Sequence, residues 1–164
     1  MAFLVDTNIL IQSKNFHYPM PYFPGFWEWL DVEVKSGRII LLDAVSNEVL
    51  EGNDQLAEWM RQRSEYVVKA KTAAVLRQVA SVTEYVMTAF PPKKIGTFLS
   101  GADAYLIAYA MGAVEAKHTV VTHERFDIGA KSPKIPVVCD HFGVPWCPLM
   151  GMFEALKPRF DLRQ

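Results

Sequence analysis

The chain opens with Met1-Ala2-Phe3-Leu4-Val5-Asp6-Thr7-Asn8, in which a short, unbroken apolar run ends at a carboxylate. Such a run is typical of a strand that is buried on both faces of a parallel sheet. Further runs of the same kind cover residues 38–42, 119–122 and 137–139. The sequence therefore predicts four buried strands, with an acidic residue at the carboxyl end of the first one.

Segments with helical patterns lie between these runs. We expect helices over residues 26–35, 46 to about 80 with a break near Gly52-Asn53, 101–116 and about 150–156. Alternating strands and helices predict an α/β fold, a three-layer α/β/α sandwich around a central, mostly parallel sheet. We expect a single domain over residues 1–164. It has a helical excursion at about 53–95, which either fills one face of the sheet or forms a lid or docking arm.

Composition excludes several classes of protein. The 164 residues are 51% apolar and 21% charged with a net charge of −1, which excludes a disordered chain and argues against coating nucleic acid by bulk attraction. Two cysteines do not make a disulfide framework. The first residues lack the pattern of a signal peptide, and the longest apolar run, 104–114, is too short to span a bilayer. We expect a cytoplasmic protein that does not enter a membrane.

Four acidic residues from separate segments are expected at one edge of the sheet. Asp6 and Glu124 follow predicted strands, whereas Glu48 and Asp103 lie in the first turns of predicted helices that begin at the same edge. Carboxylates that close together repel one another unless a cation neutralises them, and oxygen ligands suit Mg²⁺ or Mn²⁺. Such ions can activate water and stabilise a leaving oxygen. The pattern predicts metal-assisted phosphodiester hydrolysis.

Each acid also has a structural interpretation. Asp103 fits a capping box with Ser100, and Glu48 fits the preference of helix starts for negative charge. Glu124 fits a solvated loop. Asp6 has little structural purpose at the end of a buried strand, so it carries most weight in the prediction.

Four short motifs in this order resemble PIN-domain nucleases across nearly the whole chain. Their acids lie 42, 55 and 21 residues apart, and the motifs are Asp6-Thr7-Asn8, Glu48-Val49-Leu50, Gly101-Ala102-Asp103-Ala104 and Thr122-His123-Glu124. Residues 23–30 look like a little-characterised bacterial PIN-like branch. The resemblance implies a PIN-like fold, dependence on Mg²⁺ or Mn²⁺, and endonucleolytic cutting of single-stranded or structured RNA.

The resemblance also assigns roles to residues. By position, Asp6, Glu48 and Asp103 are the catalytic, metal-binding acids. Glu124 is the fourth, and it stands where the family more often has Asp, so the choice between one and two bound ions stays open. Two further residues, Asn8 and Thr122, are expected to orient Asp6 and the loop.

Partners follow from the same resemblance. RNA is the expected substrate. Many small bacterial members are toxins held in check by a partner antitoxin, and self-association is common, so an antitoxin and a second copy of the chain are candidate partners. Basic side chains near the acids form either a local rim for phosphates or a scattered solvated surface; they are Lys14, His17, Arg125, Lys131 and Lys134.

Aromatic residues between Tyr22 and Trp29 have two interpretations. They stack unpaired bases or, at spacings of three, face the core as a helix stripe. Cys139, His141 and Cys147 offer fewer than the four ligands of a structural zinc site.

We therefore predict a metal-dependent endoribonuclease. One interpretation of its role is that it is the toxin of a toxin–antitoxin pair. The main alternative is a catalytically weak PIN-like module that binds nucleic acid or protein. A haloacid-dehalogenase-like phosphatase fits less well, because Asn8 stands where that class needs a second Asp.

Overall fold

A computed structural model describes residues 1–113 and 116–161. Strand β1 (Phe3–Val5) lies at the centre of a parallel sheet, between β2 (Ile39–Leu42) and β4 (Thr119–Val121). The sheet has the order β3-β2-β1-β4-β5, with β3 (Val67–Val68) and β5 (Trp146–Cys147) at its edges. The chain runs outward from β1 to β3 and then returns to the other side of β1. The strand order therefore reverses between β1 and β4, which is where ligands bind in open α/β sheets.

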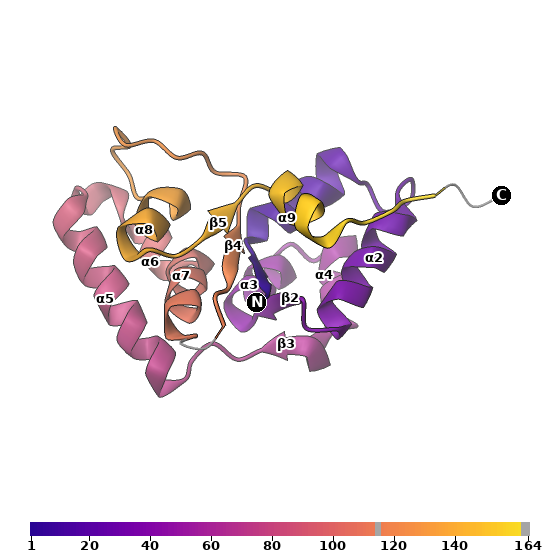
Figure 1. Cartoon of the computed structure of the whole chain (residues 1–164), viewed down its shortest axis with the longest axis horizontal. Coiled ribbons are helices and arrows are strands. Elements are labelled where there is room, and N and C mark those ends of the chain that lie inside the picture. The colour runs from indigo at the N-terminus through magenta and orange to yellow at the C-terminus, as the bar shows by residue number, and fades with distance from the viewer. Residues whose placement is uncertain (114–115, 162–164) are drawn as a thin grey trace.

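Helices cover both faces of this sheet (Figure 1), which confirms the predicted three-layer α/β/α fold. The helices α5, α7 and α8 lie on one side of the sheet in this view, and α2 and α9 lie on the other. The α-helices are α1 (Thr7–Gln12), α2 (Pro24–Lys35), α3 (Asp43–Glu51), α4 (Gln55–Arg61), α5 (Ala73–Ala89), α6 (Gly96–Ser100), α7 (Ala102–Gly112), α8 (Ile135–Phe142) and α9 (Leu149–Leu156). Short turns of other helix types cover Ser13–His17, Ser64–Tyr66 and Pro92–Lys94.

Helix α7 packs between the sheet and α5. It contacts β1 and β4 on one side and α5 on another. Its buried residues include small alanines as well as Leu106 and Ile107, which lets neighbouring backbones approach closely. The helix was predicted over residues 101–116. It ends at Gly112, and residues 114–115 lie outside the described part of the chain.

The predicted strand at residues 137–139 is wrong. These residues belong to α8, which has Pro136 in its first turn and ends at Gly143, whose φ of 65° places it in the left-handed region. An unbroken apolar run cannot distinguish a buried strand from a buried helix. Proline at the start and glycine just past the end were the signals for a helix.

The long helical region predicted after residue 46 is also corrected. The chain forms α3 and α4, and then β3 extends the sheet before α5 begins. The segment 53–95 is therefore not purely helical, because it includes an edge strand. Its α5 packs against α7, as expected for an element that covers the sheet.

Within the described ranges, no helix combines the length and apolar character needed to cross a membrane.

Candidate active site

The candidate site lies at the carboxyl ends of β1 and β4, where the strand order reverses. Asp6 follows β1 directly, and its backbone N–H donates to the carbonyl of Val121 at 3.0 Å. Thr122 follows β4 and is fully buried. Its hydroxyl donates to Asp6 Oδ2 at 3.0 Å, so a hydrogen bond joins the ends of the two strands.

Asp6 is a buried carboxylate with a raised pKa. Only 2% of the residue is exposed. It caps α1 by accepting the backbone N–H of Asn8 at 3.3 Å, so it has a structural role that was not expected from the sequence. Burial raises the pKa of Asp6 to about 6, against the opposing effect of the hydrogen bonds from Thr122 and Asn8. The charges of Glu124 and Glu48 raise it further.

Asp103 lies in the first turn of α7 and has the larger shift. Burial raises its pKa to about 8, and the charges of Asp6, Glu124 and Glu48 add to the effect, while Lys134 partly offsets it. Four carboxylates from β1, α3, α7 and the loop after β4 therefore act on one another at this edge. Negative charge is concentrated there without enough positive charge to balance it.

Glu48 is held by two donors that come from distant parts of the chain. The hydroxyl of Thr7 donates to Oε2, and the backbone N–H of Ala102 donates to Oε1 at 2.8 Å. Gly101 precedes α7 and has no side chain with which to cap it, so the carboxylate of Glu48 takes that role. A Cβ atom at Gly101 would lie 2.9 Å from Glu48 Oε1 and 3.0 Å from the carbonyl oxygen of Thr97. Glycine is therefore needed for this close approach.

Glu124 is held in a similar way by the start of another helix. Its Oε2 accepts the backbone N–H of Ile135, the first residue of α8, at 2.6 Å. Lys134 Nζ lies 3.4 Å from Oε1, and the backbone N–H of Glu124 donates to the Thr122 hydroxyl at 3.1 Å. The Thr122 hydroxyl thus links Asp6 and Glu124.

The structure brings the four predicted acids and Thr122 to one edge of the sheet. The capping box considered for Asp103 is not formed, because the Ser100 hydroxyl donates to the Thr97 carbonyl at 3.4 Å and Gly101 is the residue that precedes the helix. In the part of the chain that the structure describes, no three Asp, Glu, His or Cys side chains form a group that could hold a metal ion. Cys139, which is buried in α8, and Cys147 in β5 are therefore not part of such a group among the described residues.

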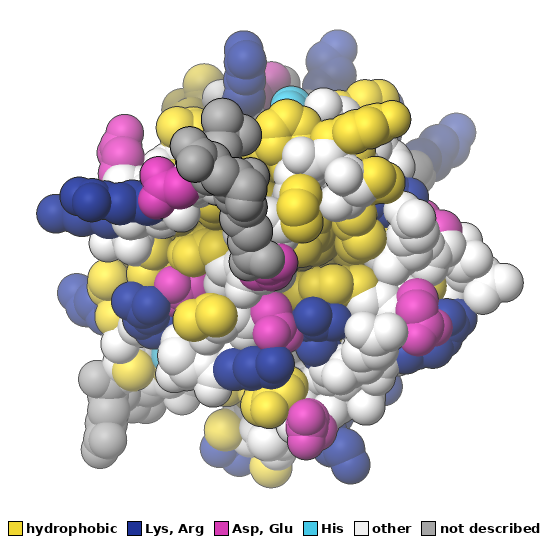
Figure 2. All heavy atoms as spheres, turned by 90° about the vertical axis from the view of Figure 1, so that its right-hand side faces the viewer, with side chains coloured by type: hydrophobic (Ala, Val, Ile, Leu, Met, Phe, Trp, Pro, Cys, Tyr) yellow, Lys and Arg dark blue, Asp and Glu magenta, His cyan; other side chains and the backbone are white. Residues whose placement is uncertain are grey.

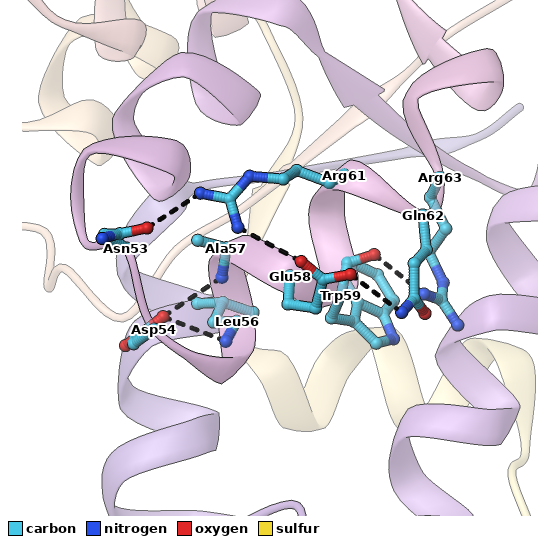
Figure 3. A network of polar contacts seen from close by, with 9 residues as sticks. All are labelled: Asn53, Asp54, Leu56, Ala57, Glu58, Trp59, Arg61, Gln62 and Arg63. Atoms are coloured by element: carbon cyan, nitrogen blue, oxygen red, sulfur yellow. Dashed lines mark hydrogen bonds and ion pairs between the residues drawn. The ribbon is translucent and has the colours of Figure 1, made fainter.

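The other predicted residues differ in their placement. Asn8 contacts Asp6 through its backbone N–H, and the residue itself is exposed. Lys14 forms an ion pair with Asp54, whose carboxylate also accepts the N–H groups of Leu56 and Ala57 at the start of α4 (Figure 3). Lys14 is therefore occupied by a structural contact.

Arg125 and Lys131 are exposed in the loop between Glu124 and α8. Their predicted contact with substrate stays a prediction. Lys134, at the end of the same loop, faces the acids directly through its contact with Glu124.

Two positioning residues were missed by sequence reasoning. Thr7 donates to Glu48, and Gly101 leaves room for its carboxylate; both lie inside motifs that were recognised for their acids alone. The signal for Gly101 was a glycine directly before a helix start that has no side-chain cap. The contact of Thr7 with Glu48 spans 41 residues and left no local signal.

A family described as "Domain of unknown function (DUF4411)" matches residues 3–160. The chain belongs to the DUF4411 family. No curated protein matches this DUF4411 chain. A chain in the crystal structure of VapBC2 from Rickettsia felis bound to a DNA fragment from their promoter is similar to it, with a TM-score of 0.51 and 16% identity. The match covers 90% of the DUF4411 chain and 98% of that chain. The likeness is one of fold, and it confirms the PIN-like fold that the motifs predicted.

Proposed function

We propose that this chain is a metal-dependent endoribonuclease and that its acidic edge binds Mg²⁺ or Mn²⁺. The observation that carries the proposal is the convergence of Asp6 and Asp103 with Glu48 and Glu124 at the reversal of strand order. Burial and this crowding raise the pKa of Asp6 to about 6 and that of Asp103 to about 8. A bound cation would favour the ionised form of both carboxylates and balance the charge that the protein leaves in excess.

The donor set fits a magnesium-like ion. Mg²⁺ is usually held by one or two carboxylates, with water and substrate phosphate oxygens as its other ligands. Asp6 and Asp103 would supply those carboxylates. When bound, such an ion would activate a water molecule as the nucleophile and would help to balance the charge of the phosphate.

The chain's own residues fix the two aspartates. The Thr122 hydroxyl holds Asp6 Oδ2, and Glu48 holds the N–H of Ala102, the residue before Asp103. Lys134 supplies positive charge beside Glu124, and Arg125 directly follows Glu124 in the same loop. These cations favour the approach of a phosphate to an edge that is otherwise negative.

The test is cleavage of a mixed-sequence single-stranded RNA with Mn²⁺, with Mg²⁺ and with a chelator. We expect the ions to produce fragments with a 5′ phosphate and a 3′ hydroxyl, and Asp6→Asn and Asp103→Asn to abolish cutting. Glu51→Gln is the matched control, because Glu51 is exposed in the same helix as Glu48. Cutting by Asp6→Asn at the wild-type rate would contradict the proposed site.

One observation favours the second candidate, a catalytically weak binding module. Glu48 and Glu124 already accept hydrogen bonds from the starts of α7 and α8, and the described residues contain no three-ligand group. The same assay, with RNA binding measured beside cleavage, separates the candidates, because RNA that is bound but not cut at saturating Mn²⁺ identifies the module.

The proposal includes partners and location. The similar Rickettsia felis chain comes from a complex named VapBC2 bound to DNA. By analogy we propose an antitoxin partner for this chain, with a homodimer as a second assembly and the cytoplasm as its location.

A further inference from the structure

A second hollow lies where α2 begins and has a volume of about 440 Å³, which is within the range of ligand pockets. Five of its lining side chains are aromatic, and three of these are substantially exposed: Tyr22 at 80%, Phe23 at 47% and Phe160 at 44%. Figure 2 shows the side of the molecule that carries α2 and the C-terminal segment, where hydrophobic side chains gather at the surface. We call this hollow the aromatic pocket.

The inner wall of the aromatic pocket is fixed by packing. Tyr18 stacks on the buried ring of Phe26, with centroids 4.3 Å apart and planes 11° from parallel. The ring of Phe23 meets Tyr18 edge to face at 5.8 Å. The indole N–H of Trp27 donates to the carbonyl of Tyr18 at 2.7 Å, which fixes the backbone at this point. A flat ligand would therefore meet rings that are already in position.

Ring contacts connect the aromatic pocket with the loop that carries Glu124. His17 precedes Tyr18, and their ring centroids lie 6.4 Å apart. On its other side His17 lies 5.6 Å from the ring of His123, the residue between Thr122 and Glu124. The aromatic pocket and the loop after β4 thus lie on either side of His17.

We propose that the aromatic pocket binds an unpaired base of the strand whose backbone lies at the acidic edge. The proposal rests on the proposed nuclease function, and it adds that the substrate is single-stranded near the cut. Aromatic rings stack on any base, and a base in a duplex is not available to enter such a pocket. Among the described residues that line the pocket, the charged one is Asp161, and its acidic side chain favours a base over a phosphate as the occupant.

Binding is measured with a fluorescent mixed-sequence single-stranded RNA and with the blunt duplex of the same sequence, in Ca²⁺ to slow cleavage. We expect Tyr22→Ala and Phe23→Ala to weaken binding of the single strand about tenfold and to leave weak duplex binding unchanged. Tyr22→Trp should retain tight binding because it keeps a ring. Leu76→Ala is the matched control, since Leu76 is an exposed apolar residue of α5.

A scan of single abasic nucleotides locates the base. One abasic position, at a fixed distance from the cut, should reproduce the loss caused by Tyr22→Ala and cause no further loss in that variant. With Mn²⁺, Tyr22→Ala should raise KM and leave kcat unchanged. Equal RNA affinity of Tyr22→Ala, Phe23→Ala and wild type would overturn the proposal, and it would assign the pocket to another kind of partner.

The two proposals can fail separately. If the wild type does not cut RNA but its affinity for the single strand depends on Tyr22, the proposed base-binding role of the aromatic pocket is supported and the proposed nuclease activity is contradicted. If the wild type cuts RNA and the Tyr22 and Phe23 variants bind it with wild-type affinity, the proposed nuclease activity is supported and the proposed role of the aromatic pocket is contradicted.

Discussion

The two glutamates and the two aspartates of the acidic edge are in opposite electrostatic situations. Glu48 and Glu124 each accept a backbone N–H from the start of a helix, α7 and α8 respectively, where the positive end of the helix dipole stabilises a carboxylate. Asp6 and Asp103 have raised pKa values, because burial and the neighbouring charges disfavour their ionised forms.

This difference separates residues that hold helix starts in place from residues that can bind a cation. Each glutamate accepts a backbone N–H from a helix start, and a second group contacts it, Thr7 for Glu48 and Lys134 for Glu124. Asp6 also accepts donors, from Asn8 at the start of α1 and from Thr122, but burial outweighs them and its pKa stays raised. The aspartates are the acids whose ionised forms the protein leaves unstabilised. We infer that the aspartates receive the cation, and that the glutamates position them.

Removing an aspartate should have the largest effect. Asp6→Asn and Asp103→Asn should reduce Mn²⁺-dependent cleavage about a thousandfold or more, because each removes a proposed direct ligand of the ion. Glu48→Gln and Glu124→Gln should lose about 10- to 100-fold, as expected for residues that position ligands. Rates measured side by side at saturating Mn²⁺ test this. Equal losses at all four positions would remove the distinction.

The pH dependence of stability should show how unfavourable the folded environment is for the ionised aspartates. Their folded pKa values, about 6 and about 8, lie above the ordinary value of 3.8, so the folded state binds more protons than the unfolded state between these values. The free energy of unfolding of the metal-free protein should therefore fall as the pH rises from about 4 to about 8.

Thermal unfolding across this range measures the effect. Asp103→Asn should lack the fall between pH about 6 and about 8 and should have a Tm several degrees higher than wild type at pH 8. Added Mn²⁺ should raise the Tm of the wild type at pH 8 and not that of Asp103→Asn. A wild-type Tm that does not change with pH in the absence of metal contradicts the assigned shifts.

Displacing Glu48 should have a smaller effect. Gly101→Ala places a Cβ atom 2.9 Å from Glu48 Oε1 and 3.0 Å from a backbone oxygen, so the start of α7 must shift. We expect a loss of stability of about 1–3 kcal/mol and slower cleavage. Gly96→Ala is the control, because a Cβ atom there meets nothing within 4 Å. Urea unfolding of both variants gives the comparison, and equal midpoints would count against the proposed role of Gly101.

The smallest effect is expected at Thr7. Thr7→Val removes the hydroxyl that donates to Glu48 Oε2, which should cost about 1 kcal/mol of stability, whereas Thr7→Ser keeps the donor. Cleavage by Thr7→Val should fall by less than cleavage by Glu48→Gln, since the N–H of Ala102 still holds the other oxygen. Wild-type stability and activity in Thr7→Val would show that this contact does not position Glu48.

The sequence predicted where the acids lie because one rule of parallel sheets determines that location. Residues at the carboxyl ends of parallel strands, and at the starts of the helices that follow, meet at one edge. Asp6 and Glu48 could therefore be placed together across 42 residues without any view of their contacts. The rule needs only that the strands be recognised, and β1, β2 and β4 each have a clear apolar run.

Other features could not be predicted from local patterns. The strands β3 and β5 are two residues long and too short to give an apolar period. The contact between Glu48 and Ala102 joins residues 54 apart, and only the folded packing of α3 against α7 creates it. Such contacts decide which carboxylates are stabilised by a helix start. The sequence therefore predicted that the four acids lie together, but it could not predict that they form two electrostatically different pairs.

The central claim is that Asp6 and Asp103 share a divalent cation. A crystal soaked in Mn²⁺ tests this directly through its anomalous scattering. We predict a peak within coordinating distance of carboxylate oxygens of both aspartates, with the hydrogen bonds of Glu48 to Ala102 and of Glu124 to Ile135 still in place. A map with no peak at these two residues, or with manganese bound only elsewhere, would contradict the account.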